Sequence, residues 1–242
     1  MTPSKNEHDF SAKHHALLFT CISKSVIMLT GDEDGIPIIR KAVRKYGEQR
    51  GLRMALRALR NGHRLTMDNY LAYGEWELPR GEMKLRFAER GPHARVHILK
   101  CPWNDVWAKN NLLEYGMHFC KEIDAALVRG FNPDLEIDIK SIQTHGADYC
   151  DFIYKEANLS AFKMLCLAYK KKIKPGKNAI MPWDYHAGHL LKTLGEVIRN
   201  ELKDSSDKIL KRAMEEFKGY ASEKHIVQLK KYQSTNFEII PG

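Results

Sequence analysis

The sequence contains few cysteines and no long apolar run. A membrane-spanning helix needs roughly 20 consecutive apolar residues, whereas the most apolar segment, residues 16–29, is interrupted by Lys24 and by several hydroxyl groups. The first eleven residues are polar and include Asp9 and Glu7, which does not fit a secretory signal or a transit peptide. We therefore expect a cytoplasmic protein with no membrane partner.

The five cysteines are widely spaced, at positions 21, 101, 120, 150 and 166, and none belongs to a C-x-x-C pair. This spacing argues against a disulfide framework and against a zinc ribbon. Three interpretations remain: buried thiols of the core, a nucleophile, or scattered metal ligands.

Positive charge is in excess, with a formal net charge of +9. Most lysines stand among glutamates at helical spacing, which is typical of a solvated helix face. The one concentrated run, Lys170–Lys174, falls in an expected loop before Pro175. Because no nucleic-acid motif or platform of aromatic and basic residues accompanies the charge, we do not expect a nucleic-acid partner.

Two kinds of hydrophobic periodicity predict an α+β fold. Residues with helical spacing predict helices over 14–30 and 38–59, with a break at Gly31–Gly35, and further helices from 159 to 232. Alternating runs predict strands at 83–89, 94–100, 135–140 and 149–155, with helices at 103–114 and 117–129 that separate near Gly116.

Short connections between consecutive strands favour one antiparallel sheet of about four strands, with helices on one face. Two central helices lie within this unit, and N- and C-terminal helices flank it. We expect residues 1–242 to form a single compact domain, helical over 14–75, α+β over 76–156 and helical again over 157–232.

Six arginines mark the second predicted helix, and two interpretations of them stay open. They are Arg40, Arg44, Arg50, Arg53, Arg57 and Arg60. The favoured interpretation is a solvated stripe. The alternative is that Arg50 or Arg53, beside Gly47 and Gly51, turns inward to hold a carboxylate.

Reactive side chains are densest between residues 101 and 151. Cys120 and Asp124 are four residues apart and share one helix face, and an unpaired buried Asp is costly. The second group starts at a turn, His145-Gly146, and continues into the strand that carries Cys150. Each group has an ordinary structural interpretation: a core thiol beside a paired Asp, and a surface histidine.

In combination, these segments resemble the L-2-amino-thiazoline-4-carboxylic acid hydrolase family. The resemblance rests on Cys101-Pro102-Trp103, the Cys120/Asp124 helix, Gly130–Pro133, and Gly146 followed by Cys150-Asp151-Phe152. It covers about residues 15–156 and is best over 98–154. The last segment is also similar to the 4-vinyl reductase domain family of small-molecule-binding domains.

The first resemblance implies a hydrolase that opens a small cyclic amidine, or a related C–N bond, to a carbamoyl-cysteine product. It implies a catalytic site of four residues, with Cys120 as nucleophile, His145 as base or acid, Asp124 orienting or protonating, and Cys150 as a further catalytic candidate. Trp103, His118, Arg50 and Arg53 are the candidate substrate-binding residues, with an arginine for the substrate carboxylate.

Two alternatives stay open beside this mechanism. In one, Cys101, Cys120, His145 and Cys150 include ligands of zinc or another divalent metal that activates water; we favour the reaction without a cofactor. In the other, the chain is a non-catalytic small-molecule-binding protein with a 4-vinyl reductase-like core. A homo-oligomer also stays open.

Overall fold

The computed structural model describes residues 9–172 and 176–241 as an α+β structure. Its helices and strands follow one another along the chain in this order: α1 (Ala12–Thr30), α2 (Asp32–Arg60), α3 (Met67–Ala72), β1 (Lys84–Glu89), β2 (Ala94–Lys100), α4 (Pro102–Lys109), α5 (Leu113–Phe131), β3 (Ile137–Ser141), η1 (Gln143–His145), β4 (Cys150–Tyr154), α6 (Ala161–Lys172), α7 (Gly176–Ala179), α8 (Trp183–Leu202), η2 (Lys203–Ser205), α9 (Ser206–Phe217) and α10 (Glu223–Lys230).

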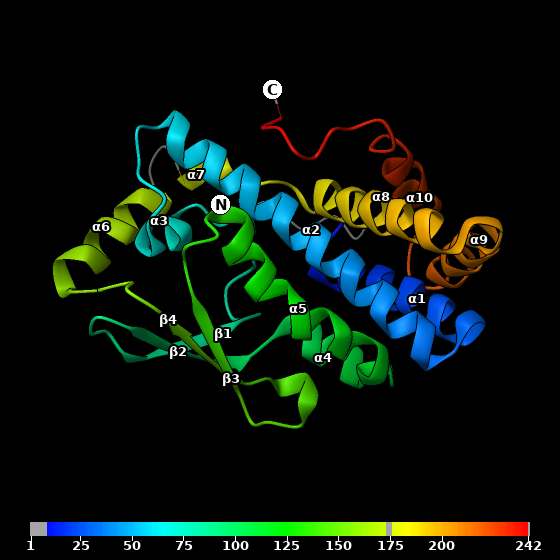
Figure 1. The fold of residues 1–242 in the computed structure, drawn as a ribbon, viewed down its shortest axis with the longest axis horizontal. Coiled ribbons are helices and arrows are strands. Elements are labelled where there is room, and N and C mark those ends of the chain that lie inside the picture. Colours follow the sequence, from blue (N-terminus) through cyan, green and yellow to red (C-terminus); the bar gives the residue numbers. More distant parts are fainter. Residues whose placement is uncertain (1–8, 173–175, 242) are drawn as a thin grey trace.

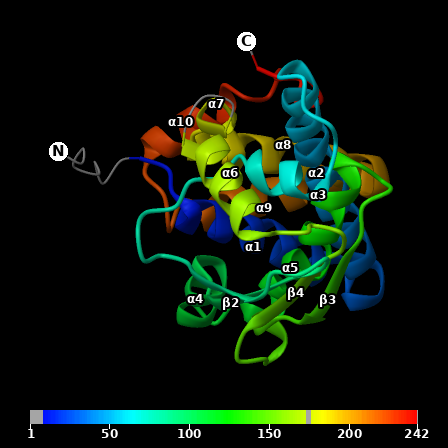
Figure 2. The ribbon, with the colours of Figure 1, turned by 90° about the vertical axis from the view of Figure 1, so that its left-hand side faces the viewer.

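The four strands form one antiparallel sheet in the order β1-β2-β4-β3, as the alternating runs predicted. Strand partners on the inner face are apolar, with Val96 of β2 opposite both Phe87 of β1 and Phe152 of β4. Charged pairs occupy the outer face, where Arg95 donates two hydrogen bonds to Asp151, at 2.9 and 2.6 Å. Figure 2 shows the helices on one side of the sheet.

Helices α2 and α5 run side by side above the sheet, and α1 packs between α2, α4, α8 and α9 (Figure 1). A Cβ atom at Gly51 would collide with the backbone of α5 at Leu127 and Phe131, and one at Gly130 would collide with the backbone of α2 at Glu48. These two glycines therefore allow α2 and α5 to pack backbone against backbone.

Three boundaries differ from the expected ones. Residues 32–35 form the first turn of α2 rather than a break, because Gly31, with φ of +83°, is enough to end α1. The break between α4 and α5 falls at residues 110–112, and Gly116 lies inside α5 against the ring of Trp107. Helix α6 continues to Lys172, so Lys170–Lys172 are helical, while residues 173–175 lie outside the described residues.

Candidate functional site

A cavity of about 320 Å³ lies between the inner face of the sheet and the helices. The strands supply an apolar side, which includes Leu85, Phe87, Val96 and Phe152, and α5 supplies Phe119, Cys120, Ile123, Asp124 and Leu127. Other segments complete the lining; among them are Arg50 on α2, Tyr70 on α3, Glu75 and Trp76 before β1, Cys101 and Trp103 at the start of α4, and Leu167 and Lys171 on α6.

Asp124 is the acidic side chain of α5 that faces this cavity. The helix repeat places it one turn after Cys120, on the same face. Burial raises the pKa of the Asp124 carboxyl to about 6, and the nearby Arg50 guanidinium opposes this shift. A carboxyl with a pKa near neutrality can both accept and release a proton under physiological conditions.

Three thiols, those of Cys101, Cys120 and Cys150, also line the cavity. Burial is the main reason why the pKa of each is raised; for Cys150 it is raised to about 12. Cys101, Asp124 and Cys150 raise the pKa of Cys120 further, whereas a hydrogen bond with the side chain of Thr144 lowers it. These cysteines are therefore protonated thiols at neutral pH in the absence of a ligand.

Next to the cavity, three arginines of α2 converge on Glu75. Arg53 donates to both carboxylate oxygens at 2.9 Å, Arg57 donates at 2.6 Å and Arg50 at 3.3 Å. All four side chains are almost completely buried. Burial alone would raise the pKa of Glu75, but Arg53 and Arg50 hold it well below its usual range. One carboxylate faces three guanidinium groups, so the cluster retains an excess of positive charge.

Arg50 connects this cluster to the cavity. Its guanidinium carbon lies 3.7 Å from the ring centre of Trp76, a cation–π contact that fixes the plane of the group. Its Nη1 has no hydrogen-bond partner among the described residues, although the side chain is only 3% exposed. A buried cationic donor without a partner is costly, and a carboxylate in the cavity would satisfy it.

Neutral histidines surround the cluster. Burial is the main cause that lowers the pKa of His15, of His189 and of His186, the last to about 3. The indole N–H of Trp103 can only donate, so Nδ1 of His15 accepts at 3.2 Å and its Nε2 donates to the hydroxyl of Tyr46. This bond holds Trp103 in the cavity wall.

The structure brings five of the predicted site residues together around one cavity: Arg50, Trp103, Cys120, Asp124 and Cys150. The expected solvated arginine stripe is wrong for Arg50, Arg53 and Arg57, which are buried. Arg53 does turn inward to a carboxylate, but that carboxylate is Glu75. Its other donors are also used, by the carbonyl of Phe237 and by His189.

His145 and His118 do not line the cavity. Gly146, with φ of +90°, ends η1 as the glycine was expected to do, but this turn points Thr144 inward and leaves His145 exposed. The part of the His145 side chain that is desolvated is the main cause that lowers its pKa, and the positive charges of Lys121 and Arg40 lower the pKa further. His118 precedes Cys120 by two residues, which is about 200° around a helix, so it faces away from the cavity.

Residues that the sequence reasoning missed include Glu75, Tyr70 and Tyr154. The two tyrosines line the cavity near Asp124, which raises the pKa of both hydroxyls in addition to the larger effect of burial. A signal for Glu75 was present: with Glu77 it is one of two acids in the otherwise apolar segment 71–78, and Arg50, Arg53 and Arg57 share one helix face.

No group of three or more His, Cys, Asp or Glu side chains within residues 9–172 and 176–241 is arranged to hold a metal ion. His145, which was expected as a possible ligand beside Cys101, Cys120 and Cys150, does not join these three thiols at the cavity. In the part of the chain that the structure describes, no helix is long and apolar enough to cross a membrane.

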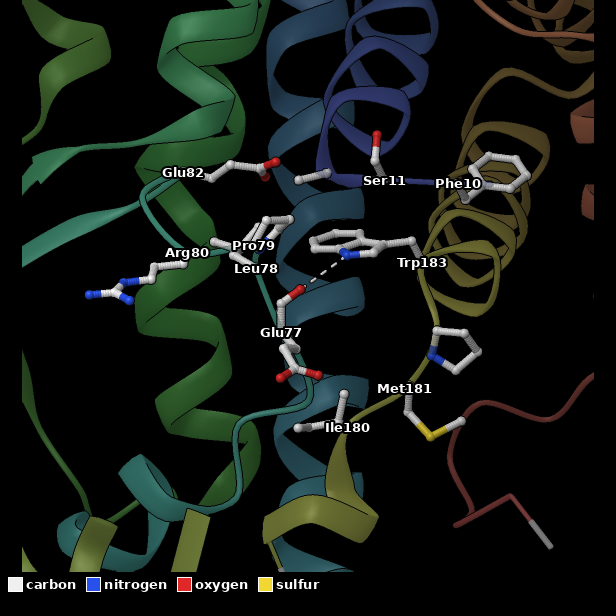
Figure 3. A pocket seen from close by; sticks show the side chains of 12 residues that line it. Phe10, Ser11, Glu77, Leu78, Pro79, Arg80, Glu82, Ile180, Met181 and Trp183 are labelled. Carbon is white, nitrogen blue, oxygen red and sulfur yellow. Dashed lines mark hydrogen bonds between the residues drawn. The ribbon is translucent and has the colours of Figure 1, made fainter. Parts of the chain in front are cut away.

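A second hollow, of about 600 Å³, opens between the segments 77–82 and 180–183 beside the start of α1 (Figure 3). Trp183 reaches across it and donates a hydrogen bond from its indole to the carbonyl of Glu77, at 3.2 Å. Its described lining includes Glu77, Arg80 and Glu82 but no His or Cys, and none of these three charged residues is buried. The first cavity is therefore the better candidate for chemistry.

An α+β protein with a mostly apolar cavity, a few convergent polar groups and a carboxyl of shifted pKa has the features of a small-molecule site. The chain belongs to the L-2-amino-thiazoline-4-carboxylic acid hydrolase family, whose model matches residues 10–154. The name of that family describes a hydrolase. No curated protein and no solved structure matches the chain.

Proposed function

We propose that this protein hydrolyses a small cyclic amidine that carries a carboxylate, of the 2-aminothiazoline-4-carboxylate type. The observation that carries this proposal is the presence, in one cavity, of a cationic side chain with a free donor, Arg50, and a carboxyl with a pKa near 6, Asp124. Membership of the family supports the reaction class.

Arg50 binds the substrate carboxylate in this proposal. In the absence of a ligand, Nε of Arg50 already donates a hydrogen bond to Glu75, and the guanidinium plane already contacts the Trp76 ring. Little conformational entropy is therefore lost when a ligand binds. The excess positive charge of the Glu75 cluster attracts an anion. Because Arg50 and Asp124 line the same cavity, a substrate whose carboxylate is held at Arg50 can bring its ring to the Asp124 carboxyl.

Asp124 then moves the proton. Its ionised carboxylate takes a proton from a water molecule while the oxygen of that water forms a bond to the amidine carbon. The carboxyl gives this proton to the ring nitrogen, which leaves a tetrahedral adduct with a hydroxyl group on the former amidine carbon. Asp124 then transfers the hydroxyl proton to the same nitrogen as the carbon–nitrogen bond breaks and the carbonyl forms. One water is consumed, the ring opens, and the step uses no cofactor.

Cys120 is the second candidate for the attacking group, since it lies one helical turn from Asp124. Burial raises the pKa of its thiol, so a covalent route requires Asp124 to remove the thiol proton first. We favour water for this reason. A Cys120→Ala variant separates the two routes, because water attack survives the loss of sulfur and covalent catalysis does not.

The experiment incubates purified protein with 2-aminothiazoline-4-carboxylate and follows, by mass spectrometry, the gain of one water. We expect Asp124→Asn to lower kcat about a hundredfold or more and Arg50→Met to raise KM, while Cys120→Ala keeps most of the activity. Arg60→Met, at the exposed end of the same helix, and Cys21→Ala, on α1, are the matched controls.

Full activity of Asp124→Asn would overturn the assignment of the base. An inactive but folded Cys120→Ala variant would replace water by the covalent route. If the wild-type protein binds this compound and leaves it intact, the non-catalytic binding protein becomes the better description.

A further inference from the structure

We infer that the ligand of the cavity between the sheet and α5 combines one carboxylate with an apolar body larger than a single five-membered ring. The inference rests on the proposed function in one respect, the placement of the carboxylate at Arg50. It goes further because the size and lining of the cavity define a substrate class that the name of the family does not.

The size of the cavity is the first argument. An apolar cavity of about 150 Å³ is enough to hold one benzene molecule, and this cavity measures about 320 Å³. A thiazoline ring with a carboxylate would leave a large part of that space unfilled. Unfilled apolar space forfeits dispersion contacts with its lining, so a larger ligand gains affinity here.

The distribution of polarity is the second argument. Charged lining residues come from the helices and the segment before β1, and they are Arg50, Glu75, Asp124 and Lys171. The strands contribute apolar side chains and no charged group; their polar atoms are the thiol of Cys150 and the hydroxyl of Tyr154. A ligand that matches this arrangement is polar at its helix-facing end and apolar where it meets the strands.

The edge of the sheet extends this apolar side. Leu85 and Phe87 on β1 lie opposite Ile98 and Val96 on β2, and all four line the cavity. Leu85 is 52% exposed, so the apolar lining reaches the surface at this strand. The geometry therefore points to an alkyl or aryl substituent that runs from the reacting ring across the sheet toward β1.

Binding of simple acids tests this inference without any turnover. Calorimetric titration of the purified protein with butyrate, hexanoate, octanoate and decanoate measures the effect of the apolar body, and the matched alcohols measure the effect of the carboxylate. We expect the affinity to rise about fourfold for each methylene that is buried, and each acid to bind at least tenfold more tightly than its alcohol.

Two variants and a control make the assignment specific. Arg50→Met should remove the difference between octanoate and octanol. Leu85→Ser, at a strand position that is half-exposed, should reduce the gain in affinity from hexanoate to decanoate. Val227→Ser, at an exposed position on α10, should change neither.

Equal affinities for butyrate and decanoate, or for acids and alcohols, would overturn the inference, as would an unchanged preference in Arg50→Met. The two proposals fail separately. Tight decanoate binding without hydrolysis of any cyclic amidine refutes only the proposed reaction. Hydrolysis of 2-aminothiazoline-4-carboxylate, together with an affinity for acids that does not depend on their chain length, refutes only the inference of an apolar body.

Discussion

Glu75 is the carboxylate that holds three buried arginines in place, and its removal leaves their charges uncompensated. Breaking a buried ion pair by removing one partner costs about 3–5 kcal/mol. We therefore expect Glu75→Gln to lower the free energy of unfolding by about this amount, as measured by urea denaturation at neutral pH. Glu77→Gln, two residues further on and exposed, should change it by less than about 1 kcal/mol. Similar values for the two variants would contradict this role of Glu75.

The raised pKa of Asp124 should make the free energy of unfolding depend on pH. Its folded-state pKa of about 6 lies above the value of about 3.9 for an unfolded Asp. The native state therefore binds the proton more tightly, and the contribution of Asp124 to stability falls as pH rises through this window. The free energy of unfolding of Asp124→Asn should equal that of the wild type near pH 4 and exceed it by about 1–3 kcal/mol above pH 7.

The control for this pH series is Asp134→Asn, at an exposed position just after α5. The neutral histidines around Glu75 also make the stability of the protein depend on pH. As pH falls below about 6.5, the free energy of unfolding decreases, because these histidines take up protons more readily in the unfolded state than in the folded one. This histidine effect is the same in the wild type and in both variants. The difference in the free energy of unfolding between Asp124→Asn and the wild type therefore reports Asp124 alone. A difference that does not vary between pH 4 and 7 would refute a raised pKa.

At the residue scale, spacing on a helix predicted the site better than residue type did. Cys120 and Asp124 were placed on one face by their separation of four, and the structure has both at the cavity. His145 was expected as base or acid from the family resemblance, whereas its position beside Gly146 favoured a surface histidine; the orientation of a side chain in a 3-10 turn cannot be obtained from sequence, and the structure leaves this side chain exposed. The burial of Arg53 depends on Glu75, which is 22 residues away.

The packing of α2 against α5 positions Arg50 relative to Asp124, and it depends on small residues. Since a Cβ at Gly130 would overlap the backbone of Glu48, Gly130→Ala must push the two helices apart. Overpacking of this kind costs about 1–3 kcal/mol, and a displacement of α2 should also lower the affinity for a carboxylate ligand. Thermal unfolding and calorimetric titration with octanoate measure the two effects.

Gly91→Ala is the control for this comparison, because a Cβ at Gly91, in the β1–β2 turn, would meet no atom within 4 Å. It should keep both the melting temperature and the affinity. A Gly130→Ala protein with wild-type affinity would mean that the site does not depend on the distance between α2 and α5.

At the element scale, the four strands followed from period-two alternation and were confirmed, because the alternating apolar residues, such as Phe87, Val96 and Phe152, fall on the face that lines the cavity. The glycines were harder to interpret. Gly116 was expected to end a helix, whereas it lies within α5 and admits the ring of Trp107. The sequence alone does not distinguish a glycine that forms a turn from a glycine that makes room for a neighbouring side chain; only the tertiary structure does.

At the scale of the whole molecule, the helices after residue 157 complete the site, although the family match ends at 154. Leu167 and Lys171 of α6 line the cavity, and His189 of α8 bonds to Arg53 at 3.3 Å. The segment after α10 runs back toward the end of α2 (Figure 1), where Phe237 stacks on His189 with ring centres 4.3 Å apart. The sequence resemblance could not predict these contacts, because it ends at about residue 156 and does not cover α6, α8 or the segment after α10.

Shortened chains test how far the site depends on that segment. The carbonyl of Phe237 accepts a hydrogen bond from Arg53 at 2.6 Å, and its ring is 2% exposed. A chain that ends at Tyr232 should therefore fold with a free energy of unfolding lower by about 3–5 kcal/mol, while a chain that ends at Ile240 should match the full length. A chain that ends at residue 156 should show no cooperative transition, since α1 and α2 would lose the packing of α8 and α9. Circular dichroism during urea unfolding measures all three, and cooperative unfolding of the 156-residue chain would refute this dependence.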